Sequence, residues 1–297
     1  MTQAPRPRIA LALVTLWLVW GSTYLAIAVA VETLPPFLMA GVRFVLAGVL
    51  LFAVARIQGA PLPSAGQWRS ATLIGALLLL LGNGLVCWAQ RWMPTGMTSL
   101  IIASTPLWMT IIAWLSGEPR PSARVLVGLA LGLAGVLVLV SGRASDPTVD
   151  HRWVASAAVL AASIAWALGS VWSRRLPQAA SPVMAAGAQM LAGGALLLLV
   201  SFALRERVAW EGVRPASLLA FAYLVVVGSV VGYGCYVYLL RAASPTLVST
   251  YAFVNPVVAV SLGALVLGEA LTPRLALGAA LVVPAVVLIV LGARRKP

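Results

Sequence analysis

The sequence predicts an all-α integral membrane protein made of two related halves. Three observations lead to this prediction: an apolar composition, a series of apolar segments of membrane-spanning length, and a set of landmarks that occurs twice. Of the 297 residues, 62% are hydrophobic and 9% are charged, and the mean hydropathy is +1.01. Such a chain lacks the polar surface that a water-soluble protein of this length needs, so we expect it in a lipid bilayer.

Ten apolar stretches are long enough to cross the hydrocarbon core of a bilayer, which takes about 20 helical residues. The links between them are short, and the Gly and Pro residues within them are compatible with helices in lipid. We expect these ten helices at residues 9–31, 34–56, 70–91, 94–116, 122–141, 153–174, 180–203, 215–240, 245–267 and 273–292.

The second half of the chain repeats the landmarks of the first half about 150 residues later. Five helices per half would make the second half enter the membrane from the opposite side. We therefore predict two inverted-topology five-helix repeats, at 1–143 and 153–297, joined by a polar linker at 144–152. The matched landmarks are Gly82-Asn83-Gly84 with Gly232-Tyr233-Gly234, Thr105-Pro106 with Asn255-Pro256, Gly117-Glu118 with Gly268-Glu269, and Leu34–Gly48 with Ala180–Gly194.

Positive charge is distributed unevenly between the loops on the two sides of this predicted arrangement. With the N-terminus in the cytoplasm, the inside loops hold twelve cations and the outside loops hold seven. The positive-inside rule therefore places both termini in the cytoplasm. The formal net charge of +13 then reflects loop bias and contact with lipid, so we predict no nucleic-acid partner. The first segment is too long for a cleaved signal peptide, so we expect it to remain in the mature protein.

The landmarks resemble those of EamA-type members of the drug/metabolite transporter superfamily. The resemblance covers nearly the whole chain and rests on Trp20-Gly-Ser-Thr23, Gly41-Val-Arg43-Phe44, Pro94-Thr-Gly96 and the two X-Pro pairs at 105–106 and 255–256. It implies ten helices in two inverted repeats and the export of amino acids or related metabolites, as in exporters of the YddG type. It also implies a multi-pass protein of the bacterial inner membrane. The resemblance leaves the substrate open.

Polar and aromatic residues in the middle of the predicted helices are the candidates for a substrate site. Trp20 and Tyr24 share one face of the first helix, and Trp166 and Ser170 share the equivalent face of the sixth, so we expect the two faces to confront each other. The alternatives are core packing for the tryptophans and inter-helix hydrogen bonding for the amides. The candidate substrate-binding residues are Trp20, Ser22, Arg43, Asn83, Trp108, Trp166, Ser170, Gln189, Tyr233, Tyr251 and Asn255.

Arg43 is the one formal charge that we place well inside a predicted helix. An unpaired guanidinium there costs at least about 2.5 to 3.5 kcal/mol, so it must meet water, carbonyl groups or an anion. Its counterpart in the second half is Gln189, which is polar but neutral. Two hypotheses remain open: Arg43 binds a substrate carboxylate, or it holds neighbouring helices together as a hydrogen-bonding hub. The residue types alone favour the hub.

Pro106 and Pro256 occupy matched positions in the predicted fourth and ninth helices. Each removes a backbone donor and clashes with a preceding carbonyl, so we expect both helices to kink near mid-bilayer and to act as hinges for alternating access. The alternative is that the prolines only shape the packing. We place no Asp, Glu, His or Lys deep in a helix, so proton coupling would have to use Glu32, Glu118, Glu269 or the protons of the substrate.

Other function classes find little support in the sequence. The single histidine, His151, lies in the linker without a nucleophile, a metal-binding motif or a phosphate-binding loop, so we predict neither an enzyme nor a cofactor nor a metal site. The expected partners are a small-molecule substrate and the lipid bilayer. We expect a monomer, with an oligomer as the alternative. Two further functions stay open: a multidrug or cation exporter of the same fold, and a non-transporting membrane scaffold.

Overall fold

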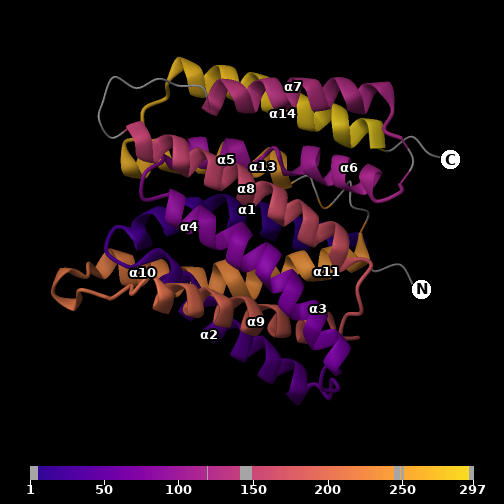
Figure 1. Cartoon of the computed structure of the whole chain (residues 1–297), viewed down its shortest axis with the longest axis vertical. Helices are drawn as coiled ribbons and strands as arrows, with labels where there is room; N and C mark the ends of the chain where they lie inside the picture. Colours follow the sequence, from indigo (N-terminus) through magenta and orange to yellow (C-terminus); the bar gives the residue numbers. More distant parts are fainter. Residues whose placement is uncertain (1–5, 119, 141–148, 244–247, 249–250, 294–297) are drawn as a thin grey trace.

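The computed structural model describes residues 6–118, 120–140, 149–243, 248 and 251–293, and the chain in these ranges is helical with short connections (Figure 1). The described residues include no β-strand. Within the described ranges each predicted apolar segment is largely helical, because long apolar runs bounded by Pro, Gly or charged residues leave little freedom in where a helix ends. The predicted segment 245–267 and the predicted linker 144–152 lie partly outside the described residues. The structure thus confirms an all-helical protein.

Among the described residues, seven helices are long and apolar enough, by length and composition, to cross a membrane. They are Pro7–Val31 of α1 (Arg6–Val31), α2 (Pro36–Ile57), the composite helices Ala65–Ala89, Thr95–Leu115 and Pro215–Ala242, His151–Ser173 of α8 (Val149–Ser173), and α9 (Pro182–Ala203). Three further helices have shorter apolar portions of 10–17 residues, namely α7 (Ala123–Val140), α13 (Tyr251–Leu267) and α14 (Pro273–Ala293). The predicted total of ten crossings stays a prediction.

Two of the composite helices contain π-helical stretches at matched places in the two halves. The first composite helix consists of α3 (Ala65–Gly75), η1 (Ala76–Gly84) and α4 (Leu85–Ala89). The second consists of α10 (Pro215–Tyr223), η3 (Leu224–Tyr233) and α11 (Gly234–Ala242). Each π-helical stretch reaches the Gly-X-Gly landmark of its half. Since π-helical insertions are rare and occur often at functional sites, these two indicate that a functional site lies near the middle of the bundle.

The matched prolines do not have matched backbones. The Thr95–Leu115 helix is interrupted by a turn at residues 103–104, which separates α5 (Thr95–Ile102) from α6 (Thr105–Leu115), and Pro106 lies in the first turn of α6. Helix α13, in contrast, continues through Pro256. The helix is thus interrupted before Pro106 and continuous through Pro256, and the expected pair of hinges stays a prediction.

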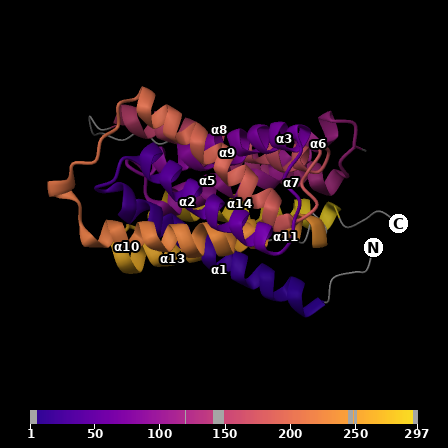
Figure 2. The same cartoon turned by 90° about the horizontal axis from the view of Figure 1, so that it is seen from below.

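The helices of one half pack mainly against helices of the other half. Helix α2 lies along α9, and α7 lies along α14 at the opposite edge of the bundle (Figure 1). Helix α1 packs against α13 and the α10–α11 helix, whereas α8 packs in the mirrored way against α6 and the α3–α4 helix. The start of α1 and the end of α14 lie on the same side of the bundle in both views (Figures 1 and 2).

The seam between α2 and α9 is built on four glycines in a two-fold symmetric pattern. A Cβ atom at any of these glycines would lie 2.8–2.9 Å from an atom of the opposite helix, so the seam requires residues without side chains. The alignment of Leu34–Gly48 with Ala180–Gly194 maps each contact onto another contact of the set. The contacts are Gly41 with Leu198, Gly187 with Phe52, Gly48 with Leu191, and Gly194 with Val45.

Candidate functional site

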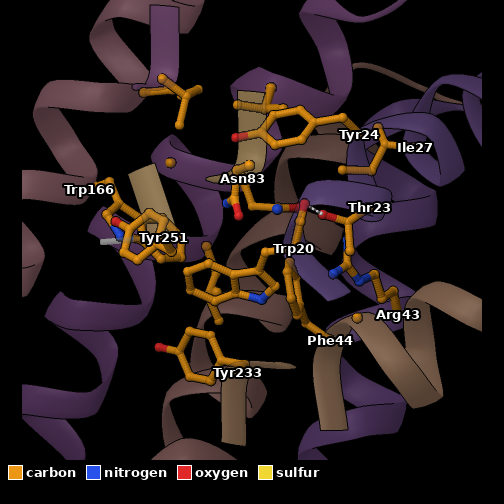
Figure 3. Close-up of a pocket in the computed structure, with 17 residues that line it drawn as sticks. Trp20, Thr23, Tyr24, Ile27, Arg43, Phe44, Asn83, Trp166, Tyr233 and Tyr251 are labelled. Atoms are coloured by element: carbon orange, nitrogen blue, oxygen red, sulfur yellow. Dashed lines mark hydrogen bonds between the residues drawn. The ribbon is translucent and has the colours of Figure 1, made fainter. Parts of the chain in front are cut away.

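A cavity of about 80 Å³ lies between the two halves, next to both π-helical stretches (Figure 3). Ligand pockets for drug-sized molecules span roughly 300 to 1,000 Å³, so this cavity is small and has room for water or a small group. Its wall is mostly aromatic and apolar, with a few polar groups. The aromatic and polar residues that line it are Trp20, Thr23, Tyr24, Arg43, Phe44, Asn83, Trp166, Tyr233, Tyr251 and Asn255.

An aromatic cluster forms one side of this cavity, with Trp20 of α1 at its centre (Figure 3). The ring of Trp20 meets those of Trp166 and Tyr251 edge to face, with centroids 5.4 and 5.3 Å apart. Tyr236 of α11 completes the cluster, 4.8 Å from Trp20. The faces of α1 and α8 thus confront each other, as their residue spacing predicts. Edge-to-face packing fixes these rings in place and leaves their remaining faces to the cavity.

Arg43 lines the same cavity from α2 and is only 3% exposed. Its Nε donates a hydrogen bond to the hydroxyl of Ser229 at 2.7 Å, and its guanidinium carbon lies 4.7 Å from the centroid of the Phe44 ring. The Nη1 atom is buried and has no hydrogen-bond partner among the described residues. A fixed positive charge with donors to spare therefore lies at the cavity wall.

Gln189, the counterpart of Arg43 on α9, has a different environment. It is also 3% exposed, but both ends of its amide are partnered within the protein. Its Nε2 donates to Oε1 of Gln178 at 3.0 Å, and its Oε1 accepts from the hydroxyl of Tyr233 at 2.6 Å. Gln189 does not line the cavity. The role of a hydrogen-bonding hub thus describes Gln189 well.

The two candidate asparagines both line the cavity and both make local hydrogen bonds. The Oδ1 atom of Asn83 accepts from the thiol of Cys87 at 3.3 Å. When the amide nitrogen of Asn255 faces α1, it donates to the backbone carbonyls of Tyr251 and Trp17, each at 3.2 Å. These bonds fix the side chains of two helices beside the cavity.

Four candidate residues lie away from the cavity: Ser22, Trp108, Ser170 and Gln189. The hydroxyl of Ser22 is 2.6 Å from that of Tyr223, and the hydroxyl of Ser170 is 2.8 Å from that of Tyr236, so these two position neighbouring helices. Trp108 donates to the hydroxyl of Ser104 at 3.1 Å and packs against the small core cluster under α7. It follows the interruption at 103–104, which separates its helix from the part next to the cavity.

Several residues of the site were not among the candidates. Ser229 holds Arg43, and its signal in the sequence is a lone hydroxyl in the apolar run from Leu224 to Val231. Phe44 and Thr23 also line the cavity, although nothing in residue type separates them from ordinary packing residues. Tyr236 joins the aromatic cluster and follows the Gly-X-Gly landmark by two residues.

The carboxylates at the ends of the helices make unequal contacts. Glu269 accepts from the backbone nitrogens of Thr95 and Gly96 at 2.7 and 3.2 Å, and from the Thr95 hydroxyl at 2.9 Å, at the start of α5. Its counterpart Glu118 has a 54% exposed side chain and one ion pair, with Arg175, at 4.0 Å. A carboxylate is favourable at a helix N-terminus, so Glu269 anchors α5 in a way that the described contacts of Glu118 do not reproduce.

Comparison of the sequence with known proteins shows that the chain is similar to membrane transporters. The EamA-like transporter family matches residues 7–141 and 153–291. The chain is 40% identical over 284 residues to the uncharacterized inner membrane transporter YedA of Escherichia coli strain K12, covering 95% of this chain and 90% of that protein. It is 31% identical over 277 residues to a WAT1-related chloroplastic protein of Arabidopsis thaliana, covering 91% of this chain and 66% of the relative.

Two further similarities concern a named efflux protein and a solved structure. The probable amino-acid metabolite efflux pump of Salmonella typhimurium strain LT2 is 28% identical over 300 residues, covering 93% of this chain and 92% of the pump. A solved structure described as "Crystal structure of protein" superposes with a TM-score of 0.67 at 23% identity, covering 98% of this chain and 99% of that one. The second similarity supports the fold alone.

Proposed function

Because the chain belongs to the EamA-like transporter family of the drug/metabolite transporter superfamily, and is a membrane transporter rather than an enzyme, we propose that it exports small metabolites, amino acids or related compounds, from the bacterial cytoplasm. The observation that carries this proposal is the cavity between the halves, where aromatic and polar side chains meet at the middle of the helices. A scaffold would need no such cavity.

The proposed architecture is ten membrane crossings in two inverted five-helix repeats, with both termini in the cytoplasm. The mirrored helix contacts and the symmetric glycine seam support the repeat. The start of α1 and the end of α14 lie on one side, as an even number of crossings requires. The excess of cations in the loops on that side supports the proposed orientation. We propose a monomer, since the cavity is formed within one chain.

The proposed mechanism is alternating access around the cavity. The described cavity is too small for a metabolite, so helices must separate to admit one and close behind it. The interruption before Pro106 and the π-helical stretches before Gly84 and Gly234 lack regular α-helical hydrogen bonding, which makes them the natural bending points. Pro256 is the second proposed hinge, by its position in the repeat.

The amino-acid class is supported by the name of the Salmonella relative, which is a probable amino-acid metabolite efflux pump. The alternative, a multidrug or cation exporter, agrees with the aromatic wall but not with Arg43, because a guanidinium without an acidic partner at the cavity wall repels a cation.

Transport in proteoliposomes tests the proposal. Vesicles containing the purified protein are given a panel of radiolabelled amino acids and one organic cation, and the initial rate of uptake is measured. We expect the Trp166→Ala variant to lose at least about tenfold in rate, because truncating a central aromatic anchor typically costs about 2 kcal/mol or more of binding, and tenfold corresponds to about 1.4 kcal/mol. The Trp210→Ala variant is the control, since Trp210 is 74% exposed and lies outside the cavity. Equal rates for both variants would count against the cavity.

A further inference from the structure

Arg43 is a buried cation without an acidic partner. The described residues form two ion pairs, Arg175 with Glu118 and Arg214 with Glu32, and neither includes Arg43. None of the residues that line the cavity is acidic. A buried charge is ordinarily paired, because leaving it unpaired costs several kcal/mol. The missing partner is therefore expected to come from outside the protein.

The unused donors of Arg43 are of the kind that pairs with a carboxylate. A guanidinium carries five N–H donors, and the described contacts use one, from Nε to Ser229. Ser229 and the ring of Phe44 hold the group from two directions. The Nη2 atom lies 3.1 Å from where a Cβ of Gly228 would be, so the glycine leaves space for the guanidinium. Two parallel N–H···O bonds from the Nη atoms to one carboxylate are the strong pairing available to such a fork.

The second half of the molecule shows what a purely structural residue looks like at this position. Gln189 satisfies its amide with Gln178 and Tyr233, and it carries no charge. The fold thus needs polarity here, but it does not need a cation. The charge is present only at Arg43, which lines the cavity, and not at Gln189, which does not.

We propose that Arg43 binds the carboxylate of the transported solute, and that the aromatic cluster holds its apolar body, so that the substrates are small organic monocarboxylates. Amino acids fall within this class, but an amino group is not required, because the cavity offers no carboxylate to an ammonium group. This inference rests on the proposed export function and narrows it.

Three ligands with one ring and different charged groups separate the possibilities: 3-phenylpropanoate, phenylalanine and 2-phenylethylamine. Binding to the purified full-length protein is measured by quenching of tryptophan fluorescence, and transport is measured in proteoliposomes. We expect 3-phenylpropanoate to bind at least as tightly as phenylalanine, and 2-phenylethylamine to bind roughly 10 to 100 times more weakly, since it lacks the charge-assisted pair.

The Arg43→Gln variant carries the residue that the mirrored position already accepts, so we expect it to fold. It should bind 3-phenylpropanoate roughly 10 to 100 times more weakly, whereas Arg43→Lys should recover part of the loss because it keeps the charge but not the fork. The Arg174→Gln variant, which changes an exposed cation, is the control for net charge and should bind like the wild type. Thermal unfolding of each variant reports whether it is folded.

Each contrary outcome has a distinct meaning. If the folded Arg43→Gln variant binds 3-phenylpropanoate like the wild type, the guanidinium is solvated by water and the proposal is overturned. Competition by chloride or phosphate as strong as by the carboxylate would replace it with an inorganic-anion site. Tight binding of 2-phenylethylamine, or transport confined to solutes without a carboxylate, overturns the carboxylate class and leaves the exporter standing. Arg43-dependent binding without transport of any solute overturns the exporter instead.

Discussion

Arg43 on α2 and Gln189 on α9 occupy mirrored positions in the two halves, yet the protein uses them differently. Gln189 is held at both ends of its side chain, by Gln178 and Tyr233. Arg43 is held at Nε by Ser229, while its Nη1 is buried without a partner at the wall of the cavity. The packing around both positions is nevertheless symmetric, because the four glycines of the α2–α9 seam make equivalent contacts.

The difference shows that the helix packing of the two halves is symmetric, whereas the polar residues next to the cavity are not. Leu79, three residues before Gly82, stands where Ser229 stands three residues before Gly232, so the second copy alone supplies a hydroxyl for the guanidinium. Asn83 occupies the position in the first half that Tyr233 occupies in the second. Tyr233 donates to Gln189 on α9, whereas the described hydrogen bond of Asn83 is with Cys87 and not with Arg43 on α2. The polar residues around Arg43 and Gln189 thus differ between the two halves, whereas the glycines of the α2–α9 seam are the same in both.

The largest expected effect is a loss of stability when the hydrogen-bonding hub at Gln189 is removed. Gln189→Met leaves the Tyr233 hydroxyl and the Gln178 amide without a buried partner, so we expect the free energy of unfolding to fall by about 1 to 3 kcal/mol. Arg43→Met removes a poorly paired charge, so we expect it to stay within about 1 kcal/mol of the wild type or to stabilise the protein. Thermal unfolding in one detergent compares the two variants. Equal losses would mean that Arg43 is a hub as well.

A somewhat smaller effect is expected at the second mirrored pair, Glu269 and Glu118. Glu269→Gln weakens three hydrogen bonds at the start of α5 without removing them all, which we expect to cost about 1 to 2 kcal/mol of unfolding free energy. Glu118→Gln removes an exposed ion pair, which solvent screens, so its loss should stay below about 1 kcal/mol. Denaturant titration of both variants checks the difference, and a larger loss from Glu118→Gln would show that this acid has an equivalent anchoring role.

The smallest expected effect is on carboxylate binding and concerns Ser229, the residue that holds Arg43. Ser229→Ala removes the acceptor that orients Arg43, so we expect carboxylate binding to weaken roughly threefold to tenfold, with little change in unfolding temperature. Ser217→Ala is the matched control, because Ser217 lies on the same composite helix and donates to the carbonyl of Val29, away from Arg43. An equal loss of affinity in both variants would assign the effect to the helix rather than to the guanidinium.

The sequence was a reliable guide to the helices, because a bilayer demands about 20 apolar residues per crossing and Pro, Gly and charged residues mark the ends. The sequence also indicates Trp20, Arg43 and Trp166, since large polar or charged groups in apolar helices face the interior of the bundle or a cavity rather than lipid. Pro106 indicates a kink in this helix, but residue types do not give the break at 103–104 itself, where the hydroxyls of Ser104 and Thr105 donate to the carbonyls of Ile101 and Ile102. Trp108 was therefore expected at the cavity, from which that interruption separates it.

The partners of Arg43 and Gln189 were beyond sequence reasoning for a related reason. Arg43 and Ser229 are 186 residues apart, and their contact depends on how two helices are rotated about their axes. A periodicity gives the face of a helix but not the atom that a side chain reaches. Residue type alone favours the hub for Arg43, and the described contacts give Arg43 one such bond, to Ser229, and Gln189 two.

The pairing of α2 with α9, and of α7 with α14, has a consequence for how the protein is made. When α2 leaves the ribosome, its main partner is still about 146 residues away, which at 5 to 20 residues per second is roughly 7 to 30 seconds of translation. Through that interval the glycine face of α2 has only lipid or other proteins to contact. Neither half can complete its packing alone, so we expect the two halves, made as separate chains, to be degraded singly and to accumulate when they are made together.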